Sequence, residues 1–346
     1  MATATTQATV RAYQVNEFGI GKLAIKEQAT PAVKPNEVRI KVRAVSLNYR
    51  DLLMITGKYN PRIQRPFTPC SDGAGEVVET GEEVTRWKVG DRVTAAFMPG
   101  WTGGRLTESA GKSALGGGGV GMLSEYVVLN EDAFVKIPGH LSFEEAATLP
   151  CAAVTSWHAL VETGKLKAGE TVLTLGTGGV SVFAVQFALM TGAEIIGTSS
   201  SDEKLEKLRK MGVSKLINYK KTPEWSKEVM KMTDGKGVDH VVEVGGTGTL
   251  DQSLKSTMHA GHVSVIGVLS GSQGDLSPRL ILMKNIRVQG IFVGSREMFE
   301  NMNRAIDVHK MKPVIDKVFA FEDAIEACQW QESGSHFGKV VIRVSK

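Results

Sequence analysis

The chain has 346 residues, of which 42% are hydrophobic and 23% are charged, so it has the composition of an ordinary soluble globular protein of about two domains. The formal net charge is only +4, and basic residues alternate with acidic ones, which excludes a nucleic-acid surface built on a basic block. Three cysteines form no paired framework and favour a reducing compartment. Residues 1–8 lack an apolar signal core, and no apolar run is long enough to cross a membrane. We therefore expect a cytoplasmic protein whose partners are small molecules.

The first part of the chain, up to about Pro150, is mostly β in character. Residues 38–45 alternate apolar and polar side chains, as in a half-buried strand. Residues 98–122 are rich in Gly and Ser and have no periodicity, which predicts a long surface loop, either a flexible insertion or a lid or partner contact. Ser142 and Glu145 have the spacing of a capping box and predict a helix start. Shorter strands are predicted at 75–81, 89–93, 124–128 and 134–137.

From about Cys151 the pattern changes to strands that alternate with helices, which predicts a doubly wound parallel sheet with right-handed crossovers. Strands are expected at 172–175, 194–198, 215–217, 238–244, 262–268 and 287–293, and helices at 180–190, 202–211, 249–258 and 296–308. The β character returns at 317–321 and 338–344. The α/β chain therefore places a dinucleotide-binding domain, residues 153–292, between two parts of a β-rich domain, residues 1–152 and 293–346.

A glycine turn lies between the first of these strands and the first helix. Gly176 allows backbone angles that a side chain would forbid, and Gly178 lets the main chain approach a pyrophosphate closely. Gly179 completes the turn and Val180 opens the predicted helix, whose free N–H groups and dipole favour a bound phosphate. The third glycine of the full fingerprint is replaced by Ser181.

The end of the second strand bears on the choice of dinucleotide. NAD enzymes usually place an acidic residue there to bind the ribose 2′-hydroxyl. Here the strand ends on Ser199, followed by Ser200, and the acids at 202 and 203 fit the start of the next helix. A serine pocket does not repel a 2′-phosphate, so the sequence favours NADPH and leaves NADH as a second cofactor.

Six motifs are spread over nearly the whole chain, at residues 46–51, 75–81, 89–93, 149–155, 176–180 and 336–341. Together they resemble the medium-chain dehydrogenase/reductase superfamily. The resemblance is strongest to its zinc-free quinone oxidoreductase branch and to proteins labelled zinc-type alcohol dehydrogenases. It implies a Rossmann domain inserted in a GroES-like catalytic domain, and a homodimer that pairs through the sixth strand of the parallel sheet.

The same resemblance assigns further cofactor contacts. It places Lys204 near the adenosine ribose with Tyr219 beside it, and Thr155 near the nicotinamide. Backbone groups of Val268 and Val293 are implied at the carboxamide, and the side chain of Lys339 at the pyrophosphate.

The resemblance also predicts that no metal is bound. Zinc-using relatives have a Cys where this chain has Asn48, and a His followed by Glu where it has Ser71 and Asp72. Only Cys151 keeps a ligand type, and catalytic zinc needs three protein ligands. The lobe that holds a structural zinc in relatives has no cysteines here, because residues 98–122 contain none.

Without zinc, reduction of a conjugated carbonyl is easier to catalyse than alcohol oxidation. Asn48 is the candidate donor to the carbonyl oxygen, and Tyr49 is a candidate proton donor or a pocket wall. Ser71 and Asp72 are candidate polar contacts, while Arg50 and Asp51 fit structural polar residues at a strand end. We expect an NADPH-dependent reductase of quinones or α,β-unsaturated carbonyls. The alternatives are reversible alcohol/ketone oxidoreduction and a crystallin-like protein that binds NADPH without turnover.

Overall fold

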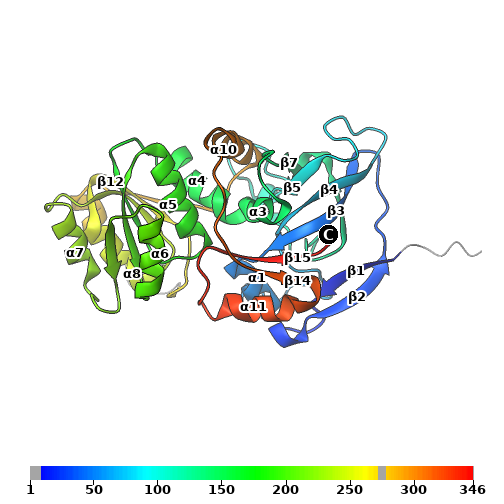
Figure 1. The fold of residues 1–346 in the computed structure, drawn as a ribbon, viewed down its shortest axis with the longest axis horizontal. Helices are drawn as coiled ribbons and strands as arrows, with labels where there is room; N and C mark the ends of the chain where they lie inside the picture. Colours follow the sequence, from blue (N-terminus) through cyan, green and yellow to red (C-terminus); the bar gives the residue numbers. More distant parts are fainter. Residues whose placement is uncertain (1–8, 272–277, 346) are drawn as a thin grey trace, which may run out of the picture. The chain divides into compact units, whose positions relative to one another are not determined.

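The computed structural model describes residues 9–271 and 278–345 (Figure 1). The chain divides into two compact units: Ala152–Val293 forms the parallel-sheet unit, and the residues before and after it form the β-rich unit. Residues 1–8, where no signal segment is predicted, lie outside the described residues. Within the described part, no helix combines the length and the apolar character needed to span a membrane.

The parallel-sheet unit contains six strands in the order β10-β9-β8-β11-β12-β13, and every neighbouring pair is parallel. The predicted doubly wound sheet is therefore confirmed. The strand order reverses between β8 and β11, and ligands of such sheets bind beyond the carboxyl ends of the strands at this point. The strands are β8 (Thr171–Thr174), β9 (Glu194–Ser199), β10 (Lys215–Asn218), β11 (Val238–Glu243), β12 (Thr257–Val265) and β13 (Arg287–Gly290).

Helices cover both faces of this sheet. On one face, Phe183 and Phe187 of α5 are buried, and Leu208 of α6 packs against Gly197 of β9. On the other face, Trp225 of α7 and Leu254 of α8 join the core with the apolar strand residues. The helices are α4 (Val154–Trp157), α5 (Gly179–Thr191), α6 (Asp202–Lys210), α7 (Trp225–Met232), α8 (Thr247–Ser256) and α9 (Arg279–Met283).

One helix of this unit was not predicted, and two predicted strands have different bounds in the structure. The sequence analysis did not predict α7, although Trp225, Val229 and Met232 have helical spacing. The strand expected at 262–268 begins earlier and ends at Val265. The strand expected at 287–293 ends at Gly290, and Val293 has a positive φ of 53°, which lies outside the extended region.

The β-rich unit is built on a mixed sheet in the order β14-β15-β3-β4-β5-β7, with β6 also paired to β3. The C-terminal strand β15 runs antiparallel to β3, with Val341 opposite Ser46. This pairing places Lys339, at the start of β15, near the end of β3. The strands are β3 (Glu37–Ser46), β4 (Asp72–Thr80), β5 (Arg92–Ala95), β6 (Tyr126–Asn130), β7 (Phe134–Lys136), β14 (Ile315–Ala320) and β15 (Lys339–Arg343), with β1 (Thr9–Gln14) and β2 (Ala24–Ala29) forming a separate pair.

The helices of the β-rich unit confirm two predictions and correct two. The helix expected at 296–308 is present as α10 (Arg296–His309). Ser142 caps α3 as predicted, since its hydroxyl oxygen accepts from the Glu145 N–H at 3.1 Å. Residues 98–122 do not form a plain surface loop, because they include α2 and the buried Met98 and Leu115. Residues 49–55 form a helix and not a strand end. The helices are α1 (Tyr49–Ile55), α2 (Glu108–Lys112), α3 (Phe143–Ala147), α10 (Arg296–His309) and α11 (Ala324–Glu332).

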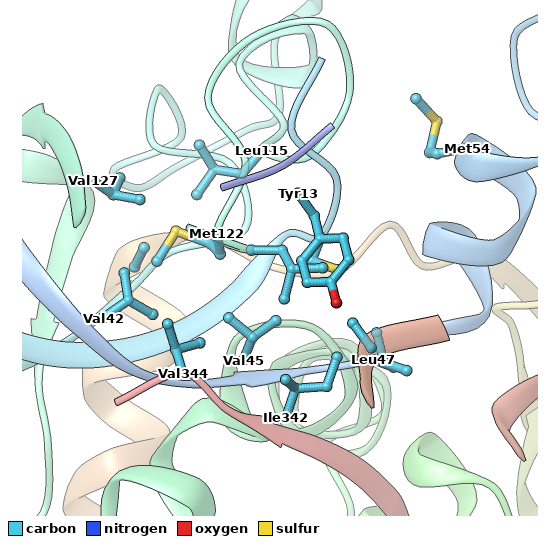
Figure 2. Close-up of a cluster of buried hydrophobic side chains, with 14 of the residues drawn as sticks. Tyr13, Val42, Val45, Leu47, Met54, Leu115, Met122, Val127, Ile342 and Val344 are labelled. Atoms are coloured by element: carbon cyan, nitrogen blue, oxygen red, sulfur yellow. The ribbon is translucent and has the colours of Figure 1, made fainter. Parts of the chain in front are cut away.

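The apolar core of this unit fixes the segment that joins β3 to α1. Figure 2 shows Val45 and Leu47 beside Ile342 of β15 in one cluster of buried side chains. Leu47 is 1% exposed, and burying a leucine side chain contributes about 1.5–3 kcal/mol. The anchored Leu47 holds the next residue, Asn48, at the start of α1.

Candidate active site

Asn48 is the N-terminal cap residue of α1 and is buried. Its backbone N–H donates to the Asp51 carboxylate at 2.8 Å, which is the N-cap bond of a capping box. Leu47 on one side and Asp51 on the other therefore fix the backbone of Asn48. Its side-chain amide lies against Ser71 and Lys339.

Lys339 provides a buried cation in contact with this amide. Its ammonium donates to the Asn48 Oδ1 at 2.5 Å and to the Leu47 carbonyl at 2.6 Å, and the residue is only 2% exposed. The predicted contact of Lys339 with a pyrophosphate stays a prediction. The structure shows that its head group is bound within the β-rich unit.

Ser71 and Asp72 lie at the start of β4 on the other side of the amide, and both are fully buried. The Ser71 hydroxyl donates to the Asp72 Oδ1 at 2.7 Å, and the Cys151 backbone N–H donates to the Asp72 Oδ2 at 3.0 Å. The Asn48 Nδ2 lies 3.5 Å from the Ser71 Oγ, at the limit of a hydrogen bond. Three of the four predicted catalytic residues are therefore in one buried polar cluster, which consists of Asn48, Asp51, Ser71, Asp72 and Lys339.

The surroundings of the two carboxyl groups in this cluster raise their pKa values. Burial, and then repulsion from Asp72, raises the pKa of Asp51 to about 6. Burial also raises the pKa of Asp72, although Lys339 and three hydrogen-bond donors act against it. One oxygen of Asp51 is buried without a partner. The position of Asp51 was not predicted as part of the site, yet its spacing from Asn48 is the capping-box signal that could have found it.

The two residues between Asn48 and Asp51 have different surroundings. Tyr49 is 45% exposed, and its role as proton donor or pocket wall stays a prediction. Arg50 donates to the Leu115 carbonyl at 2.8 Å and lies over the ring of Phe97. These contacts tie α1 to the segment 98–122 and support the structural interpretation of Arg50.

In the parallel-sheet unit, the glycine turn has the predicted conformation. Gly176 follows β8 with φ 71°, a left-handed angle that favours glycine, and Gly178 caps α5, which begins with Gly179 and Val180. The Ser181 hydroxyl donates to the Leu175 carbonyl at 2.7 Å. A small side chain that binds the preceding strand therefore replaces the third glycine of the fingerprint.

The predicted adenosine end lies at the carboxyl end of β9. Ser199 is buried, and its hydroxyl oxygen accepts from the Ser201 N–H at 3.2 Å. The Tyr219 backbone N–H donates to the Ser199 carbonyl at 3.1 Å, so these two residues are adjacent. Lys204 lies in the first turn of α6, and Ser200 immediately precedes that helix's cap residue. The structure therefore brings these predicted contacts to one edge of the sheet.

The predicted nicotinamide contacts include one unusual backbone. Val293 has φ 53°, which is a rare conformation for a β-branched residue, and its carbonyl lies 2.7 Å from the His158 Nδ1. Burial lowers the pKa of His158, which favours a neutral ring that can donate to this carbonyl. Thr155 is buried in α4, and Val268 is half exposed after β12. His158 was missed by the sequence analysis, which had no local signal for it.

Comparisons with known proteins agree with both units. A family described as alcohol dehydrogenase GroES-like domain matches residues 34–139, and one described as zinc-binding dehydrogenase matches residues 179–307. The zinc-type alcohol dehydrogenase-like protein C1773.06c of Schizosaccharomyces pombe is 46% identical, over 94% of this chain and 96% of its own. The human quinone oxidoreductase is 29% identical over 94% of each chain.

A solved structure matches as well. The 2-octenoyl-CoA carboxylase reductase CinF, in complex with NADP and 2-octenoyl-CoA, is 25% identical with a TM-score of 0.85, over 97% of this chain and 87% of its own. The fold, both family matches and the full-length relatives agree, and the chain therefore belongs to the medium-chain dehydrogenase/reductase superfamily of NAD(P)-dependent oxidoreductases.

Proposed function

We propose that this protein is a zinc-independent, NADPH-dependent reductase of quinones or α,β-unsaturated carbonyl compounds. The observation that supports it most directly is the Asn48 amide, a neutral hydrogen-bond donor held in a buried polar cluster. Two relatives support the substrate class: one is named a quinone oxidoreductase, and the other holds a conjugated thioester together with NADP.

Zinc does not fit this cluster. Asn48 and Ser71 are neutral oxygen ligands, and both Asp72 oxygens already accept hydrogen bonds. The Lys339 ammonium lies against the residue at the first ligand position, so a second cation would be repelled. In the described part of the chain, no group of three or more His, Cys, Asp or Glu residues could hold a metal ion. We therefore assign no step to a metal.

NADPH fits the parallel-sheet unit. The N–H groups at the start of α5 would bind the pyrophosphate, and no Cβ is present at Gly176 or Gly178 to prevent its approach. The edge formed by Ser199, Ser200 and Lys204 would accept a 2′-phosphate, because it has a positive charge and no carboxylate on the strand end. Bound NADPH would supply the hydride.

The contribution of the β-rich unit is to stabilise charge on the substrate oxygen. Addition of hydride at the β-carbon of an enone moves an electron pair onto the carbonyl oxygen and gives an enolate. An Asn48 Nδ2–H directed at that oxygen stabilises the negative charge, and burial strengthens the interaction. The enolate then takes a proton at the α-carbon, from water or from Tyr49.

Reversible alcohol/ketone oxidoreduction is the second candidate, and the name of the fission-yeast relative favours it. A substrate panel separates the candidates: NADPH or NADH with quinones, enones and ketones, and NADP with alcohols. We expect the largest kcat/KM with NADPH and an enone or quinone. A preference for alcohols and ketones would support the second candidate, and NADPH binding without turnover of any substrate would favour a crystallin-like role.

We also propose a homodimer that forms through β13. Among the described strands it pairs with β12 alone, and all four of its residues are exposed. Val288 in this strand and Phe292 just after it present apolar side chains. An open strand edge of this kind can pair with a second copy. Sedimentation analysis should give a dimer that Val288→Lys weakens, and a wild-type monomer at all concentrations would contradict the proposal.

A further inference from the structure

The proposed reaction uses the Asn48 amide but assigns nothing to the cation beside it. We propose that Lys339 is a positioning residue, which fixes the Asn48 amide with its N–H donors facing the substrate oxygen and strengthens them as donors. This inference rests on the proposed function, in which Asn48 contacts the substrate carbonyl.

The orientation of the amide follows from the chemistry of its neighbour. An ammonium group has donors and no acceptor, so the atom 2.5 Å from the Lys339 Nζ has to be the Asn48 carbonyl oxygen. The Leu47 carbonyl takes a second ammonium donor at 2.6 Å and holds the cation in place. The Asn48 Nδ2 is then directed away from Lys339, toward the acceptors Ser71 and Asp72, and in the proposed reaction one of its two hydrogens serves the substrate.

The hydrogen bonds beyond Asn48 also point from Lys339 toward Asp72. The Ser71 hydroxyl gives its hydrogen to Asp72 at 2.7 Å, so its oxygen faces the Asn48 Nδ2 only as an acceptor. Lys339, Asn48, Ser71 and Asp72 therefore form a chain in which every donor points from the buried cation toward the buried anion. The amide and the hydroxyl lie between the two charges, and hydrogen bonds aligned in this way polarise one another.

The buried positive charge affects the reaction through this chain. An ammonium bound to the carbonyl oxygen draws electrons from the amide and makes its N–H groups stronger donors. At the start of α1, this protein thus places an amide that a resident cation polarises. The cation acts through Asn48 and does not touch the substrate in this scheme.

A double-mutant cycle distinguishes this role from the alternative contact with the pyrophosphate. Lys339→Met should lower enone kcat at saturating NADPH by roughly tenfold, with the NADPH Kd within about twofold. In the Asn48→Ala background, the same substitution should lower kcat by less than about twofold, since the amide it acts on is gone. An unchanged kcat, an equal loss in both backgrounds, or a rise of more than about tenfold in the NADPH Kd would each overturn the proposal.

Two further variants control for folding. Lys284→Met is the matched control, because the Lys284 ammonium also binds backbone carbonyls, those of Lys255 at 2.8 Å and Thr257 at 2.7 Å, and it should leave kcat unchanged. If Lys339→Met does not fold, Lys339→Gln enters the same cycle, since its amide can still donate to Asn48 without the charge. We expect a smaller loss for this variant that again disappears in the Asn48→Ala background, and an equal loss there would reject the role.

A spectroscopic measurement tests the contact without turnover. In protein labelled with ¹⁵N-asparagine, the side-chain amide signals lost in Asn48→Ala identify Asn48. Lys339→Met should shift these signals and Lys284→Met should leave them unchanged. Signals that do not respond to Lys339→Met would show that the cation does not hold the amide. Because this result needs no substrate, it distinguishes a failure of the Lys339 role from a failure of the proposed reaction.

Discussion

The two units achieve polar recognition in different ways. In the β-rich unit, the buried polar cluster gathers a lysine, two aspartates, an amide and a hydroxyl, all at most 8% exposed. In the parallel-sheet unit, the turn at Gly176–Val180 offers backbone N–H groups and no ionisable side chain. A backbone-built site needs only a local pattern, whereas the cluster needs side chains from β4, β15 and the start of α1 to meet with donors facing acceptors.

The largest expected effect comes from breaking the cluster at its centre. Asn48→Ala should lower enone turnover at saturating NADPH by about a hundredfold, or roughly 3 kcal/mol, while the NADPH Kd changes little. Quinones should show a smaller loss, because their reduction needs less polarisation. Asn303→Ala is the matched control, since Asn303 is a buried asparagine whose amide donates to the Lys136 carbonyl at 3.0 Å. Unchanged enone turnover in folded Asn48→Ala would leave Asn48 as a structural residue.

The second prediction concerns Asp51, because the cluster contains two carboxyl groups and one ammonium group. Because the folded-state pKa of Asp51 is raised to about 6, its contribution to stability is present below its ordinary pKa and is lost as the pH rises through 6. Asp51→Asn removes that charge and should raise the free energy of unfolding at pH 7 by on the order of 2 kcal/mol. Denaturant unfolding should show the gain shrinking toward pH 4.

A matched substitution controls for this result. Asp91→Asn replaces a carboxylate that also accepts a backbone N–H three residues earlier, that of Lys88 at 2.9 Å, but at an exposed turn. This variant should change stability little at either pH. If Asp51→Asn destabilises the protein equally at pH 4 and pH 7, then its ionised form is not the source of the cost.

The third prediction adds a carboxylate to the end of β9, where the parallel-sheet unit has none. Ser199→Asp should place a carboxylate where the 2′-phosphate is expected and shift the ratio of NADPH to NADH affinity by roughly tenfold or more toward NADH. The Ser201 N–H that now donates to Ser199 could still donate to the new carboxylate. Ser109→Asp adds the same charge at an exposed site and should leave the ratio unchanged at equal ionic strength. Tighter NADH binding by the wild type would contradict the serine-pocket interpretation.

The difference between a site built from a local backbone pattern and a cluster of distant side chains explains what the sequence could predict. The glycine turn, the strand and helix alternation and the Ser142 cap are local patterns, and the structure contains each of them. The motif around Asn48 identified one side of the cluster. The contact between Lys339 and Asn48 could not be predicted, because it joins residues 291 positions apart through the pairing of β15 with β3. A single lysine at the start of an apolar strand was the available signal, and it was assigned to the cofactor.

The smallest expected effect is that of metal removal. If the Lys339 ammonium provides the positive charge of the cluster, then zinc has neither a ligand set nor an electrostatic reason to bind there. Protein purified without chelators should contain far less than one zinc per chain by elemental analysis, and incubation with a chelator should leave enone turnover unchanged. Zinc at about one per chain, with activity that falls on chelation and returns on zinc addition, would contradict the metal-free site. That result would also require the Lys339 ammonium to leave the Asn48 amide oxygen, because a divalent cation and a buried ammonium repel each other at such a separation.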